Sequence, residues 1–261
     1  MKYLFKDWGR FYSNIKRAPG VFLFLDYDGT LTPIVSRPED ARLPNAVKTL
    51  IKQLQKDHRF NIAIISGRSL KDIKKMVSIR EIIYAGNHGL EISGAGGKAD
   101  MFKAGGASTK YLFKKIKTSL EKQLSRVKGA WVEDKGCTLS VHFRLVEGKK
   151  KPLVKKLFRK TITPYILAKR VKVSSGKMVL EVRPGVEWDK GKAVLRILGR
   201  RKVLPVYIGD DVTDMDAFRA IKGRGISIFV GSPKPGIKAD YFLKNPKEVK
   251  HLLKSLTSVQ G

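Results

Sequence analysis

The chain has 261 residues, of which 42% are hydrophobic, and its formal net charge is +31. This length can bury one large core, or a core and a smaller domain, and no apolar run is long enough to cross a membrane. Charges interrupt the apolar residues of the first 20 positions, and Cys137 is the one cysteine. We therefore expect no signal peptide, no internal disulfide and a cytoplasmic location.

Strands and helices alternate in the first part of the chain. After an initial helix, Val21 to Leu25 has the length and the β-branched or aromatic content of a strand buried on both faces. The pattern continues with a helix at Asn45–Lys56, a strand at Phe60–Ile65, a helix at Ser69–Val77 and a strand at Glu81–Ala85. This series predicts an α/β fold with a doubly wound, Rossmann-like parallel sheet.

The middle of the chain has a different pattern, which begins after Ser93 to Gly106, a stretch rich in Gly and Ala. The predicted elements are helices at Ser108–Val127 and Lys150–Leu167 and strands at Ala130–Asp134, Thr138–Phe143, Val171–Ser174 and Met178–Val182. Paired strands with Gly-containing turns predict an antiparallel sheet under two helices, which we interpret as an inserted α+β cap domain.

The alternating series resumes with helices at Lys190–Leu198 and Thr213–Ala220 and strands at Leu204–Ile208 and Ile226–Val230. A cap inserted into a doubly wound core is the simplest account of this order. We therefore expect residues 1–107 and 185–261 to form a catalytic core and residues 108–184 to form the cap.

Two acids, Asp26 and Asp28, directly follow the first buried strand. Open α/β sheets bind ligands at the carboxyl ends of their strands, and two acids so close can share one hard cation and one phosphate while differing in protonation. A calcium loop is excluded, because Leu31 and Arg37 stand where such a loop needs Gly and Glu. A simple turn is the alternative interpretation.

Two further clusters begin predicted helices. Ser66-Gly67-Arg68 can cradle a phosphate with a hydroxyl and backbone amides, although Ser before a helix is also a common N-cap. Lys190 can neutralise a phosphate and a nucleophile as a point charge. We interpret Asp189, which precedes it, as the helix cap.

Asp210, Asp211 and Asp214 stand at the end of another buried strand, in a chain that is otherwise strongly basic. Like charges so close are unfavourable unless a cation or base compensates them. An all-oxygen ligand set of this kind suits magnesium.

Several segments resemble, in the same order, motifs of the haloacid dehalogenase-like phosphatases, and specifically of the trehalose-6-phosphate phosphatase family. They read LDYDGTLTPI, GNHGLEI, EDKGCTLSVHFR, KMVLEVRPGVEWDKGKA and GDDVTDMDAF, and the resemblance extends from Val21 to about Pro246. One departure is Met215, where the family often has Glu. Because it lies beyond the metal acids, we expect little effect on the chemistry.

The resemblance implies a role for each clustered residue. Asp26 would attack phosphorus to give an aspartyl-phosphate, and Asp28 would protonate the leaving sugar oxygen and later deprotonate the hydrolytic water. Ser66, Gly67 and Lys190 would hold the phosphoryl oxygens. Magnesium would be held by Asp26, the backbone carbonyl of Asp28 and Asp210, with Asp211 and Asp214 in support.

The resemblance also implies contacts with the sugar. The matching positions are Arg68 in the core and Glu133, Lys135, Arg144, Lys177 and Glu181 in the cap. Carboxylates and cations together can hydrogen-bond many hydroxyls, but cross-strand ion pairing on a solvated sheet face is the alternative. His142 is either a ligand or a packing residue, and Gly86-Asn87-His88 is either the floor of the site or a turn.

The charge of +31 is compatible with nucleic acid, an anionic membrane surface or an anionic substrate. Lys and Arg are dispersed, and the one dense stretch, Lys149 to Lys172, has apolar residues at helical spacing. We interpret that stretch as a solvated helix face. No zinc-finger spacing, aromatic RNA-binding signature or basic tail accompanies it.

We therefore predict a monomeric, magnesium-dependent phosphatase of trehalose 6-phosphate whose partner is a small sugar phosphate, with no specific nucleic acid and no membrane partner. One alternative is a related enzyme acting on sucrose phosphate or on a glucosyl or mannosyl glycerate phosphate. The other is a basic nucleic-acid-binding protein on the same fold, which the presence of all the catalytic positions disfavours.

Overall fold

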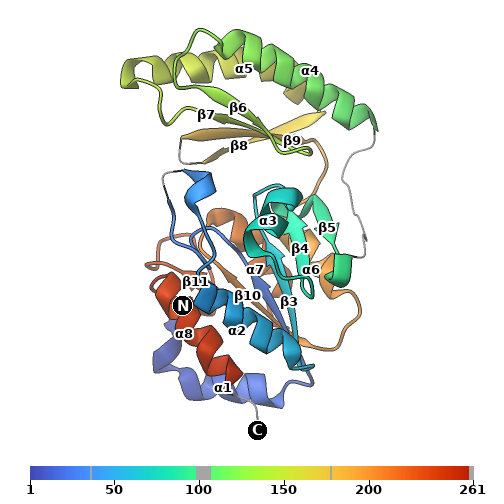
Figure 1. The fold of residues 1–261 in the computed structure, drawn as a ribbon, viewed down its shortest axis with the longest axis vertical. Coiled ribbons are helices and arrows are strands. Elements are labelled where there is room, and N and C mark those ends of the chain that lie inside the picture. The colour runs from blue at the N-terminus through green and yellow to red at the C-terminus, as the bar shows by residue number, and fades with distance from the viewer. Residues whose placement is uncertain (36, 98–106, 177, 259–261) are drawn as a thin grey trace. The chain divides into compact units, whose positions relative to one another are not determined.

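The computed structural model describes residues 1–35, 37–97, 107–176 and 178–258. The chain divides into two compact units. Unit 1 comprises Met1–Phe102 and Trp188–Gly261, and unit 2 comprises Lys103–Glu187. Figure 1 shows the elements of both units.

Unit 1 is built on an eight-stranded sheet with the order β1-β12-β11-β10-β2-β3-β4-β5. Neighbouring strands are parallel except β4 and β5. The strands are β1 Lys2–Tyr3, β2 Val21–Leu25, β3 Phe60–Ile65, β4 Ile83–Gly86, β5 Glu91–Ser93, β10 Leu204–Gly209, β11 Ile226–Val230 and β12 Tyr241–Leu243. The predicted doubly wound parallel sheet is confirmed.

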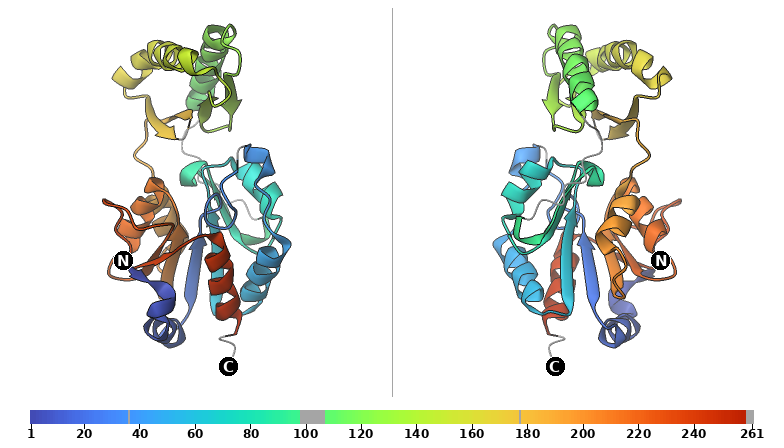
Figure 2. Two further views of the ribbon diagram at one scale, coloured as in Figure 1. Left: turned by 90° about the vertical axis from the view of Figure 1, so that its left-hand side faces the viewer. Right: turned by 90° about the vertical axis from the view of Figure 1, so that its right-hand side faces the viewer.

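Helices cover both faces of this sheet, as Figure 2 shows. They are α1 Trp8–Arg17, α2 Asn45–Lys56, α3 Leu70–Val77, α6 Lys190–Leu198, α7 Met215–Ile221 and α8 Pro246–Thr257. The strand β2 is buried along its whole length because successive side chains enter opposite layers. Leu23 packs with the layer of α1, α2, α3 and α8, whereas Phe22 and Phe24 pack with that of α6 and α7.

Unit 2 contains a four-stranded antiparallel sheet with the order β6-β7-β9-β8 and two helices. The elements are α4 Ala107–Leu124, β6 Trp131–Asp134, β7 Leu139–His142, α5 Lys151–Leu167, β8 Val171–Gly176 and β9 Val179–Pro184. One face of the sheet packs its apolar residues, such as Val141 and Val182, against the helices. This arrangement confirms the predicted α+β insertion.

The dense basic stretch in α5 has the two-sided character of a surface helix. Val154, Phe158 and Ile162 are buried in the unit 2 core, while Lys156 and Lys160 are exposed. The positive charge of this helix therefore faces solvent, as its spacing predicted. None of the helices in the described ranges is long and apolar enough to cross a membrane.

The sequence-based prediction omitted three strands and one helix. The strands β1, β5 and β12 have two or three residues each, which is too short to display a period. The helix α8 lies beyond the last predicted strand. The helix predicted from Thr213 begins at Met215, because Val212–Asp214 forms a separate 3-10 turn.

Candidate active site

Lys190 lies between two buried carboxylates that come from different parts of unit 1. Its Nζ is 2.7 Å from Oδ1 of Asp26, which follows β2, and 2.7 Å from Oδ1 of Asp214, which follows β10. The Lys190 side chain is 3% exposed. Asp189 caps the helix by accepting a hydrogen bond from the Lys192 amide at 2.8 Å, as predicted, so Lys190 is fixed in the first turn of α6.

A group of three acids surrounds this ammonium. Carboxylate oxygens of Asp26, Asp210 and Asp214 all lie within 4.8 Å of one another. One lysine cannot balance three carboxylates, and an oxygen ligand set favours a hard divalent cation. The residues present therefore fit a divalent metal.

The electrostatics of the cluster follow from its burial. Loss of water raises the pKa of the Asp26 carboxyl well above its usual range, although Lys190 opposes this change. Burial and then the charge of Asp214 raise the pKa of Asp210 to about 7. For Lys190 burial acts in the opposite direction, but the charges of Asp214 and Asp26 outweigh it and raise the pKa of the ammonium.

The Asp214 carboxylate accepts hydrogen bonds from three groups. The hydroxyl of Tyr207 and the ammonium of Lys190 both donate to Oδ1, each at 2.7 Å, and the amide of Asp211 donates to Oδ2 at 2.9 Å. Asp211 itself is exposed and its carboxylate accepts from the Val212 amide at 2.7 Å. Among the described residues, the three-acid group does not include Asp211 or Asp28.

Sequence reasoning missed Tyr207 and Thr30. Tyr207 is fully buried in β10 with its hydroxyl on Asp214, and burial raises the pKa of that hydroxyl well above 10.0. The Thr30 hydroxyl lies 3.5 Å from Oδ1 of Asp210. The only sequence feature that could have indicated Tyr207 is its hydroxyl group, which stands in an otherwise apolar strand and needs a hydrogen-bond partner when buried.

Gly29 allows the loop after β2 to approach the acids. Its φ is +87°, a conformation that favours glycine, and a Cβ atom there would overlap the carboxylate of Asp210. The predicted turn therefore also serves the site, because it places the Gly29 backbone against the carboxylate of Asp210.

The carboxylate of Asp28 is held by Arg68. Nε of Arg68 donates to Oδ2 at 2.7 Å and Nη2 donates to Oδ1 at 2.6 Å. The same guanidinium lies 5.5 Å from the centre of the Tyr27 ring. Arg68, which the resemblance associates with substrate, is thus a partner of the second aspartate in this structure.

Ser66 does not cap the helix that follows it. The N-cap of α3 is Ser69, whose hydroxyl accepts from the Asp72 amide at 3.1 Å. The buried hydroxyl of Ser66 instead accepts from the Arg68 amide at 3.1 Å. The capping interpretation of Ser66 is therefore wrong, while its phosphate-binding role stays a prediction.

The loops after β3 and β4 are joined at the predicted floor of the site. The amide of Asn87 donates to the carbonyl of Arg68 at 2.7 Å, and the amide of His88 donates to that of Ser66 at 2.9 Å. A Cβ on Gly67 would lie 2.7 Å from the His88 ring. Gly67 therefore permits this contact between the loops.

Unit 2 brings most of the predicted sugar contacts onto one sheet face. Nζ of Lys135 is 3.5 Å from Oε1 of Glu181 and 3.9 Å from Oε2 of Glu133. Arg144 is exposed and follows β7 in a turn, and Lys177 lies outside the described residues. Cross-strand ion pairing, the alternative interpretation, is therefore present among these side chains.

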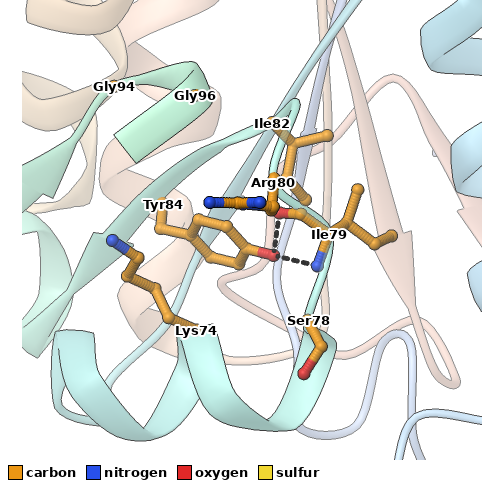
Figure 3. A pocket seen from close by; sticks show the side chains of 8 residues that line it. All are labelled: Lys74, Ser78, Ile79, Arg80, Ile82, Tyr84, Gly94 and Gly96. Atoms are coloured by element: carbon orange, nitrogen blue, oxygen red, sulfur yellow. Dashed lines mark hydrogen bonds between the residues drawn. The ribbon is translucent and has the colours of Figure 1, made fainter. Parts of the chain in front are cut away.

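A separate pocket of about 250 Å³ opens on unit 1 (Figure 3). It is lined by Lys74, Ser78, Ile79, Arg80, Ile82, Tyr84, Gly94 and Gly96. The Tyr84 hydroxyl accepts from the Ile79 amide at 3.0 Å and donates to the Ile79 carbonyl at 2.8 Å. Of the predicted site residues that the structure describes, none lines this pocket.

Comparison with known proteins gives consistent matches. Residues 24–247 match the model of the family described as trehalose-phosphatase. The chain is 34% identical to trehalose-phosphate phosphatase B of Arabidopsis thaliana, over 93% of this chain and 68% of that protein. Its fold is similar to the crystal structure of a trehalose-6-phosphate phosphatase related protein, with a TM-score of 0.79, 26% identity and coverage of 91% and 97%.

A more distant structure shows the fold alone. It is a haloacid dehalogenase-like hydrolase from B. subtilis, with a TM-score of 0.58, 14% identity and coverage of 90% of this chain and 99% of the other. The family match includes Asp26, Ser66, Lys190 and the Asp210–Asp214 segment. Because residues 24–247, well over half of the chain, match this family model, the chain belongs to the trehalose-phosphatase family.

Proposed function

We propose that this protein hydrolyses trehalose 6-phosphate to trehalose and phosphate with magnesium as its cofactor. The observation that carries the proposal is the buried contact of Lys190 with Asp26 beside a three-acid group, in a chain of this family. A nucleophile, a neutralising cation and metal ligands are the groups that phosphoryl transfer requires.

The proposed first step forms a bond between a carboxylate oxygen of Asp26 and phosphorus. The bond between phosphorus and the sugar oxygen breaks, and that oxygen takes a proton from Asp28, so trehalose leaves. In the second step a water attacks the phosphorus of the aspartyl-phosphate and gives its proton to Asp28. Phosphate departs and the Asp26 carboxylate is restored.

Asp28 has to free one carboxylate oxygen from Arg68 for this chemistry, while the other oxygen keeps its hydrogen bond. Its carboxylate is hydrogen-bonded to Arg68 at 2.6 and 2.7 Å, and it must reach the leaving oxygen within hydrogen-bond distance. The side chain of Asp28 is 40% exposed, so substrate has access to it. Arg68 then orients the acid/base through the remaining hydrogen bond.

The phosphoryl oxygens would be held by Lys190, the Ser66 hydroxyl and the Gly67 amide. Magnesium would be held by Asp26, the Asp28 carbonyl and Asp210. When bound, the metal would neutralise charge on the transferred phosphoryl group. Asp214 and Asp211 would support the metal site indirectly. The Asp214 carboxylate accepts hydrogen bonds from the Tyr207 hydroxyl and from the Asp211 amide.

We further propose that unit 2, with boundaries near 108 and 184, is the cap that selects the sugar. Support comes from the mixed carboxylates and cations on its sheet face, which suit sugar hydroxyls. The proposed contacts are Glu133, Lys135, Arg144, Lys177 and Glu181. The cytoplasmic location and the monomeric state also stay predictions.

The test is phosphate release from a panel of substrates, with magnesium or with a chelator. The panel contains trehalose 6-phosphate, sucrose 6-phosphate, glucosyl and mannosyl glycerate phosphates and an aryl phosphate. We expect trehalose 6-phosphate to have the highest kcat/KM and the chelator to abolish turnover. Preference for another sugar phosphate would establish the related enzyme instead, and activity unaffected by chelator would refute the metal.

A further inference from the structure

The open face of the unit 2 sheet carries polar residues in register across its four strands. Glu133 pairs with Ser140, Ser140 pairs with Glu181, and Glu181 pairs with Ser174. Because side chains alternate along each strand, these four belong to one face, and Trp131 and His142 belong to the same face in the next row. The opposite face packs against the helices.

His142 is hydrogen-bonded to one of these carboxylates. Its Nε2 lies 2.8 Å from Oε2 of Glu133, on the neighbouring strand. The second carboxylate, Glu181, is held differently, by Nε of Arg183 at 2.6 Å and by Lys135. Both acids are near the Lys135 ammonium, at 3.9 Å for Glu133 and 3.5 Å for Glu181, but the shortest contact of Glu133 is with an imidazole and that of Glu181 is with a guanidinium.

Trp131 fixes the plane of that imidazole. The two rings are stacked with centroids 4.0 Å apart and an interplanar angle of 10°. The indole remains 45% exposed even so. A large aromatic ring left this exposed on an edge strand gains little from core burial, but it restricts the rotation of His142 and hence the orientation of Glu133.

Ser140 supplies an independent sign that the face accepts a ligand. Its hydroxyl is buried between the two carboxylate strands and has no hydrogen-bond partner in the part of the chain that the structure describes. A buried hydroxyl without a partner is costly. A hydroxyl-bearing molecule, or a water that it retains, would provide the missing bond.

We propose that His142 is a positioning residue for sugar recognition, and that Trp131 holds its ring so that the Glu133 carboxylate is aimed at one sugar hydroxyl. The inference rests on the proposed function. It goes beyond the sugar contacts that the family resemblance implies, because those contacts include neither His142 nor Trp131. This face would recognise the neighbouring hydroxyl groups of a sugar phosphate and not its phosphate group alone.

The experiment separates the hydrogen bond from the stack. His142→Phe keeps an aromatic ring against Trp131 but removes the donor to Glu133, His142→Gln keeps a donor, and Trp131→Phe keeps a ring. The matched control is Tyr111→Ala, another exposed aromatic in unit 2. Each full-length variant is checked by thermal unfolding, and kcat and KM are measured on trehalose 6-phosphate and on an aryl phosphate.

For His142→Phe we expect kcat/KM on trehalose 6-phosphate to fall about tenfold or more, mainly through KM, with the aryl phosphate rate unchanged. His142→Gln and Trp131→Phe should recover most of the loss, and Tyr111→Ala should match the parent protein. Unchanged KM in His142→Phe, or equal losses on both substrates, would overturn the inference. A parent protein inactive on trehalose 6-phosphate would instead refute the proposed function.

Discussion

The guanidinium of Arg68 and the carboxylate of Asp28 form a two-point pair, with hydrogen bonds of 2.7 and 2.6 Å. The fork geometry fixes the orientation of the carboxylate as well as its charge environment. Because Arg68 follows the buried strand β3 and Asp28 follows β2, the pair also joins two loops of the site. The acid/base proposed here is thus oriented by a residue that the family resemblance associates with substrate.

Replacing Arg68 by Ala should therefore damage the chemical steps themselves. We expect kcat to fall by roughly tenfold to a hundredfold on both trehalose 6-phosphate and an aryl phosphate, since Asp28 loses its orientation in either reaction. Steady-state kinetics on both substrates give the measurement, and Arg68→Lys should restore little because it cannot form the fork. A loss confined to the sugar phosphate would show that Arg68 contacts the sugar instead.

Asp26→Asn should abolish turnover while the fold survives. The amide keeps the shape of the side chain but removes the attacking charge and a metal ligand, so we expect kcat to fall by several orders of magnitude. Single-turnover phosphate release and circular dichroism are the measurements. Near-normal turnover of this variant with magnesium present would exclude the covalent route.

Lys190→Met should destabilise the metal-free protein as well as inactivate it. The substitution leaves Asp26 and Asp214 buried without their shared cation, and we expect a loss of about 3 to 5 kcal/mol in the free energy of unfolding. Urea unfolding with a chelator gives the value, and Lys192→Met, an exposed position on the same helix, is the control. Equal stability of both variants would contradict the buried pairing.

The acid group predicts a specific pH dependence. Burial and Asp214 raise the pKa of Asp210 to about 7 in the metal-free fold, from 3.8. A carboxyl whose pKa is higher in the folded state favours folding when protonated. Its contribution to stability is therefore full below the unfolded pKa and is lost as pH rises through the folded one.

We accordingly expect the metal-free protein to lose stability between about pH 4 and about pH 7, and magnesium affinity to rise over the same interval because binding needs the ionised acids. Urea unfolding with chelator and calorimetric titration with magnesium measure the two trends. In Asp210→Asn the part of the stability trend that Asp210 contributes should disappear, while Asp26, whose pKa burial also raises, should keep its own part. A trend of opposite sign in the parent protein would refute the raised pKa.

The net charge of +31 should give only weak, salt-sensitive binding to nucleic acid. The lysines of α5 face solvent, and the sequence has no zinc-finger spacing or aromatic RNA-binding signature, so affinity should vanish near physiological salt. Fluorescence anisotropy with duplex and single-stranded probes over a salt series measures this. Submicromolar binding that resists salt, together with absent sugar-phosphatase activity, would favour the nucleic-acid-binding alternative.

Elements with a clear hydrophobic period could be predicted from the sequence. The strands Val21–Leu25 and Phe60–Ile65 and the helices Asn45–Lys56 and Lys190–Leu198 have the predicted bounds. The edge strands β1, β5 and β12 could not be found, because two or three residues that pair through backbone groups leave no period. Their existence depends on the sheet beside them.

In the site, the acids at strand ends could be placed because parallel strands end together. Lys190 could be singled out by its position at the start of a predicted helix, but chemistry alone did not distinguish it from the other lysines until the family motif was recognised. Tyr207 was missed because its partner, Asp214, becomes a neighbour only after the chain turns through Gly209. The sequence did not decide whether His142 is a ligand or a packing residue, because its hydrogen-bond partner, Glu133, lies on another strand.

The pairing of β2 with β10 has a consequence for synthesis. Leu23 lies opposite Val206, so the central strands of unit 1 come from the two sides of unit 2, which is continuous in the chain. During synthesis on the ribosome, unit 2 is complete before β10 emerges. Until then, the backbone groups on one edge of the apolar strand β2 have no neighbouring strand to pair with. The nascent chain therefore carries Asp26 without Lys190, and the five-residue apolar strand β2 without one of its two neighbouring strands, until Lys190 and β10 arrive. This interval is when aggregation and chaperone capture compete with folding.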